Sequence, residues 1–206
     1  MLLLDRICYN APKKIRKRKV RMKILAIVGS PRINGNTNYL TDQALSEAAR
    51  LGVTTEKIII SEKKLNPCLG HQECSGQTVC MQKDEGMEIL QKFVEADGLI
   101  LTTPIYYYDI SSWLKIFIDR NYFLYTHDIN CKAKAAGLIV VGGGAGIEET
   151  VQSLNKFLGG STLNISKRKI FVVSGYAGAP GEVRNKPELV NQAREMGKKL
   201  VESLRP

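Results

Sequence analysis

The sequence lacks the features of several large classes of protein. No apolar run approaches the length of a membrane-spanning helix. Residues 1–4 are apolar, but they are too few for the core of a signal peptide, and Asp5 and Arg6 follow at once. We therefore expect a cytoplasmic protein whose function does not require a membrane.

Several catalytic motifs are also missing. The loop at residues 29–38 contains no Gly-Lys-Ser/Thr, so it is not a Walker A loop, and hydrolysis of a nucleoside triphosphate is not expected. The loop does not match G-x-G-x-x-G either, which leaves little support for direct dinucleotide binding. There is no convincing Ser-His-Asp set and no pair of catalytic carboxylates. Asp84, Glu85 and Asp109 lie near the motifs below, but we expect them to be solvated loop acids.

Positive charge is concentrated at one end of the chain. The formal net charge is +10, and residues 1–21 hold eight Lys or Arg against one acid, Asp5. We expect residues 1–21 to be a basic, disordered extension, or translation to start at Met22, which opens the first convincing strand. A tail that contacts nucleic acid or anionic lipid is the alternative, and nucleic-acid binding is not expected. Residues 22–206 would then form one domain.

Short apolar runs alternate with amphipathic segments along this domain. The pattern predicts strands at 23–28, 57–60, 98–103, 136–141 and 170–173, the third stopped by Pro104. It predicts helices at 37–51, 86–95, 111–124, 148–158 and 187–203. This alternation indicates an α/β fold with a parallel sheet covered by helices on both faces. Five strands favour a flavodoxin-like three-layer sandwich with strand order 2-1-3-4-5.

Three loops of unusual composition follow strands of the predicted sheet, where an open parallel sheet binds its ligands. Residues 29–38 supply hydroxyl groups, amides, Arg32 and a helix N-terminus, which together form a phosphate cradle or, alternatively, a polar helix cap. Residues 103–108 offer aromatic surface for a planar ring, or a packing cluster or subunit contact. Residues 142–146 contain four glycines, which allow close approach of a ligand or form a tight turn.

Three segments, GSPRINGNTNYL, TPIYYYDISSWLKIFIDR and VGGGAGIEET, resemble the NADPH-dependent FMN reductase and iron–sulfur flavoprotein group of flavodoxin-like proteins. The resemblance runs from about residue 23 to the C-terminus. It implies that the first loop binds the FMN phosphate, the second borders the isoalloxazine ring, and the glycine loop approaches the flavin from another side. The residues implied are Ser30, Arg32, Asn36, Thr37 and Asn38; Pro104, Ile105, Tyr106 and Tyr107; and Gly142, Gly143 and Gly144. The segment 114–120 is similar to one that commonly lies near a subunit interface, so the resemblance implies a homodimer or homotetramer.

Three of the five cysteines gather in the loop at residues 66–82. Cys68, Cys74 and Cys80 share it with His71, at offsets of 3, 6 and 12 residues from Cys68. In a cytoplasmic protein this pattern favours metal or redox chemistry over disulfides. Iron–sulfur flavoproteins carry a compact C-x2-C-x2-C-x5-C-like pattern that binds a [4Fe–4S] cluster, so the resemblance implies these four residues as ligands, with His71 in place of the second cysteine.

Three interpretations of this loop stay open. One is a cluster held by three cysteines with His71 or an outside ligand. The second is a cluster-free loop whose thiols pack near the flavin, and the third is a zinc site or a redox disulfide. Cys8 and Cys131 are solitary, so we interpret them as structural. His127 is expected at the surface or in an interface.

The resemblance implies redox chemistry carried by the flavin. NAD(P)H would pass hydride to flavin N5, and electrons would then reach an unknown acceptor directly or through the cluster. The alternative function is a non-enzymatic electron carrier that receives electrons from a ferredoxin-like partner.

Overall fold

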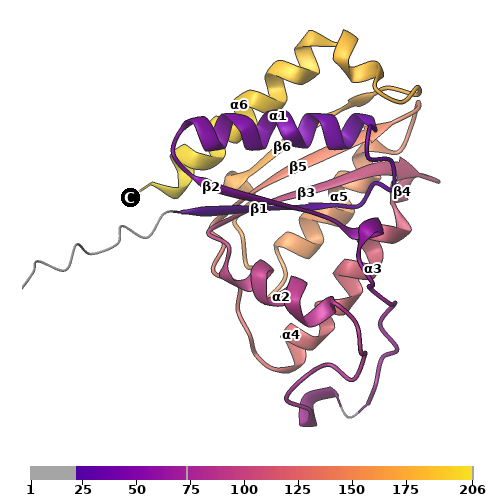
Figure 1. Cartoon of the computed structure of the whole chain (residues 1–206), viewed down its shortest axis with the longest axis vertical. Helices are drawn as coiled ribbons and strands as arrows, with labels where there is room; N and C mark the ends of the chain where they lie inside the picture. Colours follow the sequence, from indigo (N-terminus) through magenta and orange to yellow (C-terminus); the bar gives the residue numbers. More distant parts are fainter. Residues whose placement is uncertain (1–21, 73, 206) are drawn as a thin grey trace, which may run out of the picture.

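Five parallel strands form the centre of the computed structural model, which describes residues 22–72 and 74–205 (Figure 1). The predictions for residues 1–21 lie outside the described residues. The strands are arranged in the order β2 (Thr54–Ile59), β1 (Lys23–Val28), β3 (Gly98–Tyr106), β5 (Ala135–Gly142) and β6 (Ile170–Tyr176). The predicted five-strand order is therefore confirmed. A sixth strand, β4 (Asp109–Ile110), pairs antiparallel with the end of β3.

Helices cover both faces of this sheet (Figure 1). On one face lie α1 (Asn36–Arg50) and α6 (Pro187–Leu204), and on the other lie α2 (Gly86–Glu95), α3 (Ser112–Arg120), α4 (Tyr122–Thr126) and α5 (Ile147–Leu158). Short 3₁₀ turns occupy Ile60–Glu62, Cys74–Gly76, Lys167–Lys169 and Glu182–Asn185.

The strands are buried on both faces because each face packs against helices. In β1, Ile24 contributes to the core under α1 and α6, while Leu25 contributes to the core under α2, α3 and α5. Successive side chains of a strand point to opposite faces, so a run of apolar residues supplies both cores. This explains why the strands appear in the sequence as continuous apolar runs.

Several predicted boundaries are wrong. The strand predicted at 57–60 spans Thr54–Ile59, since Ile60 begins a 3₁₀ turn, and the strand predicted at 170–173 continues to Tyr176. Pro104 does not stop β3, which continues to Tyr106. β1 ends at Val28, opposite Thr102, so the sheet partner of β3 at Pro104 is β5 alone, and a residue without an N–H is tolerated there. The helix predicted at 111–124 is divided into α3 and α4 at Asn121, whose side-chain amide donates to the Phe117 carbonyl at 2.8 Å.

The carboxyl ends of the parallel strands meet at one edge of the sheet, beside β4 in Figure 1. The cysteine loop, by contrast, extends to the lower end of the molecule in that view. Within residues 22–72 and 74–205, no helix combines the length and the apolar character needed to cross a bilayer.

Candidate functional site

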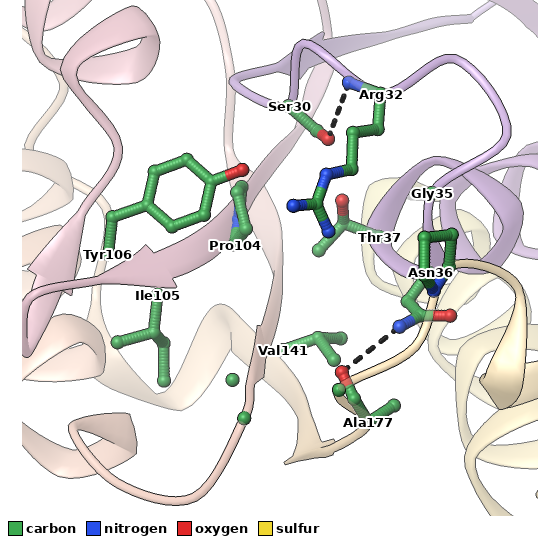
Figure 2. A pocket seen from close by; sticks show the side chains of 14 residues that line it. Ser30, Arg32, Gly35, Asn36, Thr37, Pro104, Ile105, Tyr106, Val141 and Ala177 are labelled. Carbon is green, nitrogen blue, oxygen red and sulfur yellow. Dashed lines mark hydrogen bonds between the residues drawn. The ribbon is translucent and has the colours of Figure 1, made fainter.

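A pocket that is open to solvent lies at the carboxyl edge of the sheet (Figure 2). The loops that follow β1, β5 and β6 form it together with the carboxyl ends of β3 and β5. Its lining consists of Ser30, Arg32, Gly35, Asn36, Thr37, Pro104, Ile105, Tyr106, Val141, Gly142, Gly143, Ala177, Gly178 and Pro180.

One end of the pocket is polar and carries positive charge. Ser30 is buried, and its hydroxyl accepts a hydrogen bond from the Arg32 N–H at 3.2 Å. Figure 2 shows the Arg32 guanidinium turned toward the space between Ser30 and Thr37. Helix α1 begins here without a side-chain cap and without an acidic residue in its first turn. The free N–H groups of a helix N-terminus attract anions, so this end fits a phosphate.

Asn36 lines the pocket, but its side chain is committed to the protein. The amide nitrogen donates to the carbonyls of Ala177 at 3.1 Å and Ala179 at 2.9 Å, and the amide oxygen accepts from the Val183 N–H at 3.3 Å. This side chain therefore joins the loop after β1 to the loop after β6. Only its backbone N–H remains for an anion at the helix N-terminus.

Asn38 does not line the pocket. Its buried side chain donates to the Ile33 carbonyl and accepts a hydrogen bond from Lys57 Nζ at 3.0 Å. Lys57 also pairs with Asp42 on the exposed side of α1. Asn38 thus supports the loop from behind instead of facing a ligand.

The other end of the pocket is largely apolar. Pro104, Ile105 and Tyr106 come from β3, and Val141 and Gly142 come from β5. A surface of this kind suits the face of a planar heterocycle.

The turn between β3 and β4 carries two further tyrosines. Tyr107 is 97% exposed and does not line the pocket. Tyr107 and Tyr108 have φ angles of 53° and 71°, in the left-handed region that two-residue hairpin turns require. The strained turn places Tyr107 in solvent, away from the pocket wall.

The structure brings most of the predicted cofactor residues together. Nine of the twelve line this pocket, and Asn38, Tyr107 and Gly144 do not. The residues that the sequence patterns missed are Gly35, Val141, Ala177, Gly178 and Pro180. The last three belong to a Gly- and Pro-rich stretch after β6. Its composition, together with its position at the end of a parallel strand, could have indicated it.

The three clustered cysteines are free and half-buried in the loop at residues 66–82. The Cys68 sulfur accepts from the Gly70 N–H at 3.4 Å. The Cys74 sulfur lies 3.6 Å from the Thr126 hydroxyl, whose single proton it shares with the carbonyls of Tyr122 and Phe123 at 3.1 Å. The Cys80 sulfur accepts from Arg120 Nη2 at 3.2 Å. His71 is half-buried in the same loop. In the described part of the chain, no three His, Cys, Asp or Glu side chains stand together around the position of a single metal ion.

A buried ion pair closes the neck of this loop, the place where residues 66 and 84 meet. Arg120 and Asp84 have side chains that are each 1% exposed, and Arg120 Nη1 lies 2.6 Å from Asp84 Oδ2. The expectation that Asp84 is solvated is therefore wrong. The sequence pattern did not indicate the pair, because Arg120 lies 36 residues away along the chain. Burial alone would raise the pKa of Asp84, but hydrogen bonds from Arg120 and from the N–H groups of Asn66 and Gly86 outweigh it and lower the pKa.

The two other acids behave differently. Glu85 is half-exposed, and the N–H of Lys64, followed by the Lys63 ammonium, lowers its pKa. Asp109 is exposed and accepts a hydrogen bond from the Ser153 hydroxyl at 3.3 Å. Asp109 therefore conforms to the expectation of a solvated loop acid.

His127 is half-buried and ties the cysteine loop to α4. Its ring stacks on Phe123 at 4.0 Å between ring centroids, Nδ1 lies 2.7 Å from the Phe123 carbonyl, and Nε2 lies 2.6 Å from the Gln77 carbonyl. These contacts make it a structural anchor, which the sequence pattern did not indicate.

Cys131 is buried in the core, as a structural role requires, and burial raises the pKa of its thiol to about 12. Cys8 lies outside the described residues.

In the segment from Leu114 to Arg120, residues Leu114, Phe117 and Arg120 are buried within the chain itself. Its expected part in a subunit interface stays a prediction.

Comparisons with known proteins agree with this architecture. The sequence profile of the NADPH-dependent FMN reductase family matches residues 22–196. An iron–sulfur flavoprotein of Methanocaldococcus jannaschii is 37% identical over 187 residues, which cover 88% of this chain and 96% of the relative. An iron–sulfur flavoprotein of Archaeoglobus fulgidus is 36% identical over 187 residues, 88% of this chain and 80% of the relative. The structure of an NAD(P)H:quinone oxidoreductase from Methanothermobacter marburgensis shares the fold, with a TM-score of 0.69 at 18% identity over 87% of this chain and 99% of that chain.

Proposed function

Because the chain belongs to the NADPH-dependent FMN reductase family, we propose that its pocket binds FMN and that it is an NAD(P)H-dependent flavin oxidoreductase. One observation carries this proposal. The pocket joins a polar end, made of Arg32, two hydroxyl groups and a free helix N-terminus, to a largely apolar wall. That combination matches a phosphate attached to a planar ring system.

Different residues would bind the phosphate and the ring of FMN. Arg32, the hydroxyls of Ser30 and Thr37, and the N–H groups at the start of α1 would bind the phosphate. Pro104, Ile105, Tyr106, Gly142 and Gly143 would border the ring. Asn36 and Asn38 act as positioning residues for the loop, because their side chains bond to the protein.

Bound FMN supplies the chemistry of accepting hydride from NAD(P)H and passing electrons to an acceptor. The chain contributes orientation and exclusion of water. The loops after β5 and β6 close two sides of the pocket, and Asn36 holds the latter against the helix N-terminus. The remaining open side gives access to a nicotinamide and to the acceptor.

The cysteine loop supports a second function, a carrier of single electrons with a [4Fe–4S] cluster. The chemistry of its donors fits such a group, because three free, half-buried sulfurs each accept an N–H or O–H hydrogen bond, as ligating thiolates do. The relatives from Methanocaldococcus jannaschii and Archaeoglobus fulgidus described above are both named iron–sulfur flavoproteins. Cys68, Cys74 and Cys80, with His71 or an outside ligand, would hold the cluster, and a ferredoxin-like protein would be the donor. We also propose that the protein is cytoplasmic and forms a homodimer or homotetramer.

Rapid mixing under exclusion of oxygen separates the two functions. Protein loaded with FMN is mixed with NADPH or NADH, and flavin absorbance is followed. The oxidoreductase should lose its flavin absorbance within seconds and turn over when an artificial acceptor such as a quinone is added. Flavin that is reduced by dithionite but by neither nucleotide over minutes would contradict the oxidoreductase and favour the carrier.

A further inference from the structure

Arg120 is among the largest fully buried side chains of the protein. Burying a guanidinium group is costly unless its N–H groups are paired. Nη1 donates to Asp84 Oδ2 at 2.6 Å and to the Asn66 carbonyl at 3.1 Å. Nη2 donates to Asp84 Oδ1 at 3.1 Å and to the Cys80 sulfur at 3.2 Å. The sulfur is thus one of the partners that satisfy the buried cation.

The three clustered sulfurs receive donors of different kinds. Cys68 accepts from a backbone N–H and Cys74 from a hydroxyl group, both uncharged. Among the described residues, Cys80 is the one of the three whose sulfur accepts a hydrogen bond from a charged group. Arg120 lies at the C-terminal end of α3, so a rigid element places this charge.

We propose that Arg120 is a positioning residue for Cys80 and that its guanidinium raises the reduction potential of the iron–sulfur cluster that the loop holds. The inference rests on the cluster in the proposed function. Reduction adds one electron to the cluster, from the flavin or from a ferredoxin-like donor, and forms or breaks no bond. A cationic N–H donor at a ligating sulfur stabilises the more negative, reduced form.

Asp84 has a defined part in this arrangement. It holds both arms of the Arg120 fork, and it is itself held by the N–H groups of Asn66 and Gly86 at 2.9 Å each. The two ends of the cysteine loop thus meet at one carboxylate. A lysine would keep the charge of Arg120, but its single nitrogen lacks the fork that reaches Asp84 and Cys80 together.

The main test is a redox titration of the FMN-bound protein after anaerobic reconstitution with iron and sulfide. The double substitution Arg120→Gln with Asp84→Asn removes both charges and leaves no unpaired ion in the core. We expect its cluster potential to be more negative than that of the wild-type protein, as measured by EPR and visible absorbance, with flavin still bound. Arg120→Lys should give a cluster potential between those of the wild-type protein and the double variant.

Two further variants act as matched comparisons. Thr126→Val removes the uncharged donor at Cys74 and should shift the potential in the same direction, but less. Glu85→Gln alters the same neck of the loop without touching a sulfur and should leave the potential unchanged. If the double variant does not fold, Arg120→Lys measured against Glu85→Gln provides the test.

Unchanged potential and iron content in the double variant and in Arg120→Lys would overturn the inference. A wild-type protein that binds FMN but forms no cluster would also overturn it. Flavin bleaching by NADPH in that same sample would leave the oxidoreductase proposal standing. A shifted cluster potential in a protein that ignores NADPH would support the inference and remove the oxidoreductase proposal alone.

Discussion

The hydroxyl of Ser111 donates a hydrogen bond to the carbonyl of Gly29 at 2.5 Å and joins the start of the loop after β1 to the start of α3. Ser111 is fully buried, and its oxygen also accepts the Leu114 N–H at 3.2 Å as the N-cap of α3. Its own N–H donates to Thr103 Oγ1 at 2.9 Å. One residue therefore fixes the loop after β1, the end of β3 and the start of α3 relative to one another.

We predict that Ser111→Ala lowers the free energy of unfolding by about 1–3 kcal/mol, because a helix cap is lost and a buried carbonyl is left without its donor. FMN affinity should fall as well, since the loop after β1 loses an anchor. Urea denaturation and FMN titration measure the two effects. Ser153→Ala, which removes a hydroxyl that bonds to the exposed Asp109, is the control and should change neither quantity.

Arg32 should distinguish FMN from riboflavin, which lacks the phosphate. We predict that Arg32→Gln weakens FMN binding about tenfold to a hundredfold, the range expected for a hydrogen bond to a charged group, and leaves riboflavin binding nearly unchanged. Fluorescence titration of the protein without flavin with each compound measures this. An equal loss for both flavins would show that Arg32 supports the loop and does not face the phosphate.

The sequence was sufficient to locate the pocket, because parallel strands bring their carboxyl ends to one edge whatever side chains follow. It did not show which side chains face inward. Asn38 turns away because its side chain bonds to the Ile33 carbonyl and to Lys57 of β2, and Tyr107 is carried into solvent by a left-handed turn. Both effects depend on neighbours or backbone angles that composition does not reveal. Asp84 and Arg120 illustrate the same limit, since neither residue alone indicates a buried pair.

Gly146 occupies a position that a side chain should not tolerate. Its φ is 88°, and an added Cβ would lie 2.7 Å from the Tyr108 Cα. We predict that Gly146→Ala displaces the β3–β4 turn and lowers the free energy of unfolding by about 1–3 kcal/mol. Gly143→Ala is the matched control, because an added Cβ there meets nothing within 4 Å. Thermal unfolding of the two variants should therefore differ, and equal melting temperatures would contradict this description of the turn.

Acid should weaken the protein through Asp84. Its pKa is lowered in the folded state, so its contribution is fully present above the ordinary value of about 4 and is lost as the pH falls below that value, through the lowered pKa of the folded state. At pH 7 we predict that Asp84→Asn costs about 3–5 kcal/mol of unfolding free energy, because Arg120 loses its buried partner. The difference between wild type and variant should shrink below pH 4. Urea denaturation across pH 3–7 measures it, and a constant difference would contradict the assignment.

The thiol of Cys131 should remain unreactive in the folded protein. Burial raises its pKa to about 12, so at pH 8 the thiol is both protonated and shielded, whereas the thiolate is the nucleophile. We predict that iodoacetamide at pH 8 modifies the half-buried Cys68, Cys74 and Cys80 of the iron-free protein and spares Cys131, as read by mass spectrometry of each cysteine-containing peptide. Guanidinium chloride should abolish this protection, because the unfolded thiol regains an ordinary pKa of about 8.5. Modification of Cys131 in the folded protein as fast as that of the clustered cysteines would mean that the core around it opens on the time scale of alkylation.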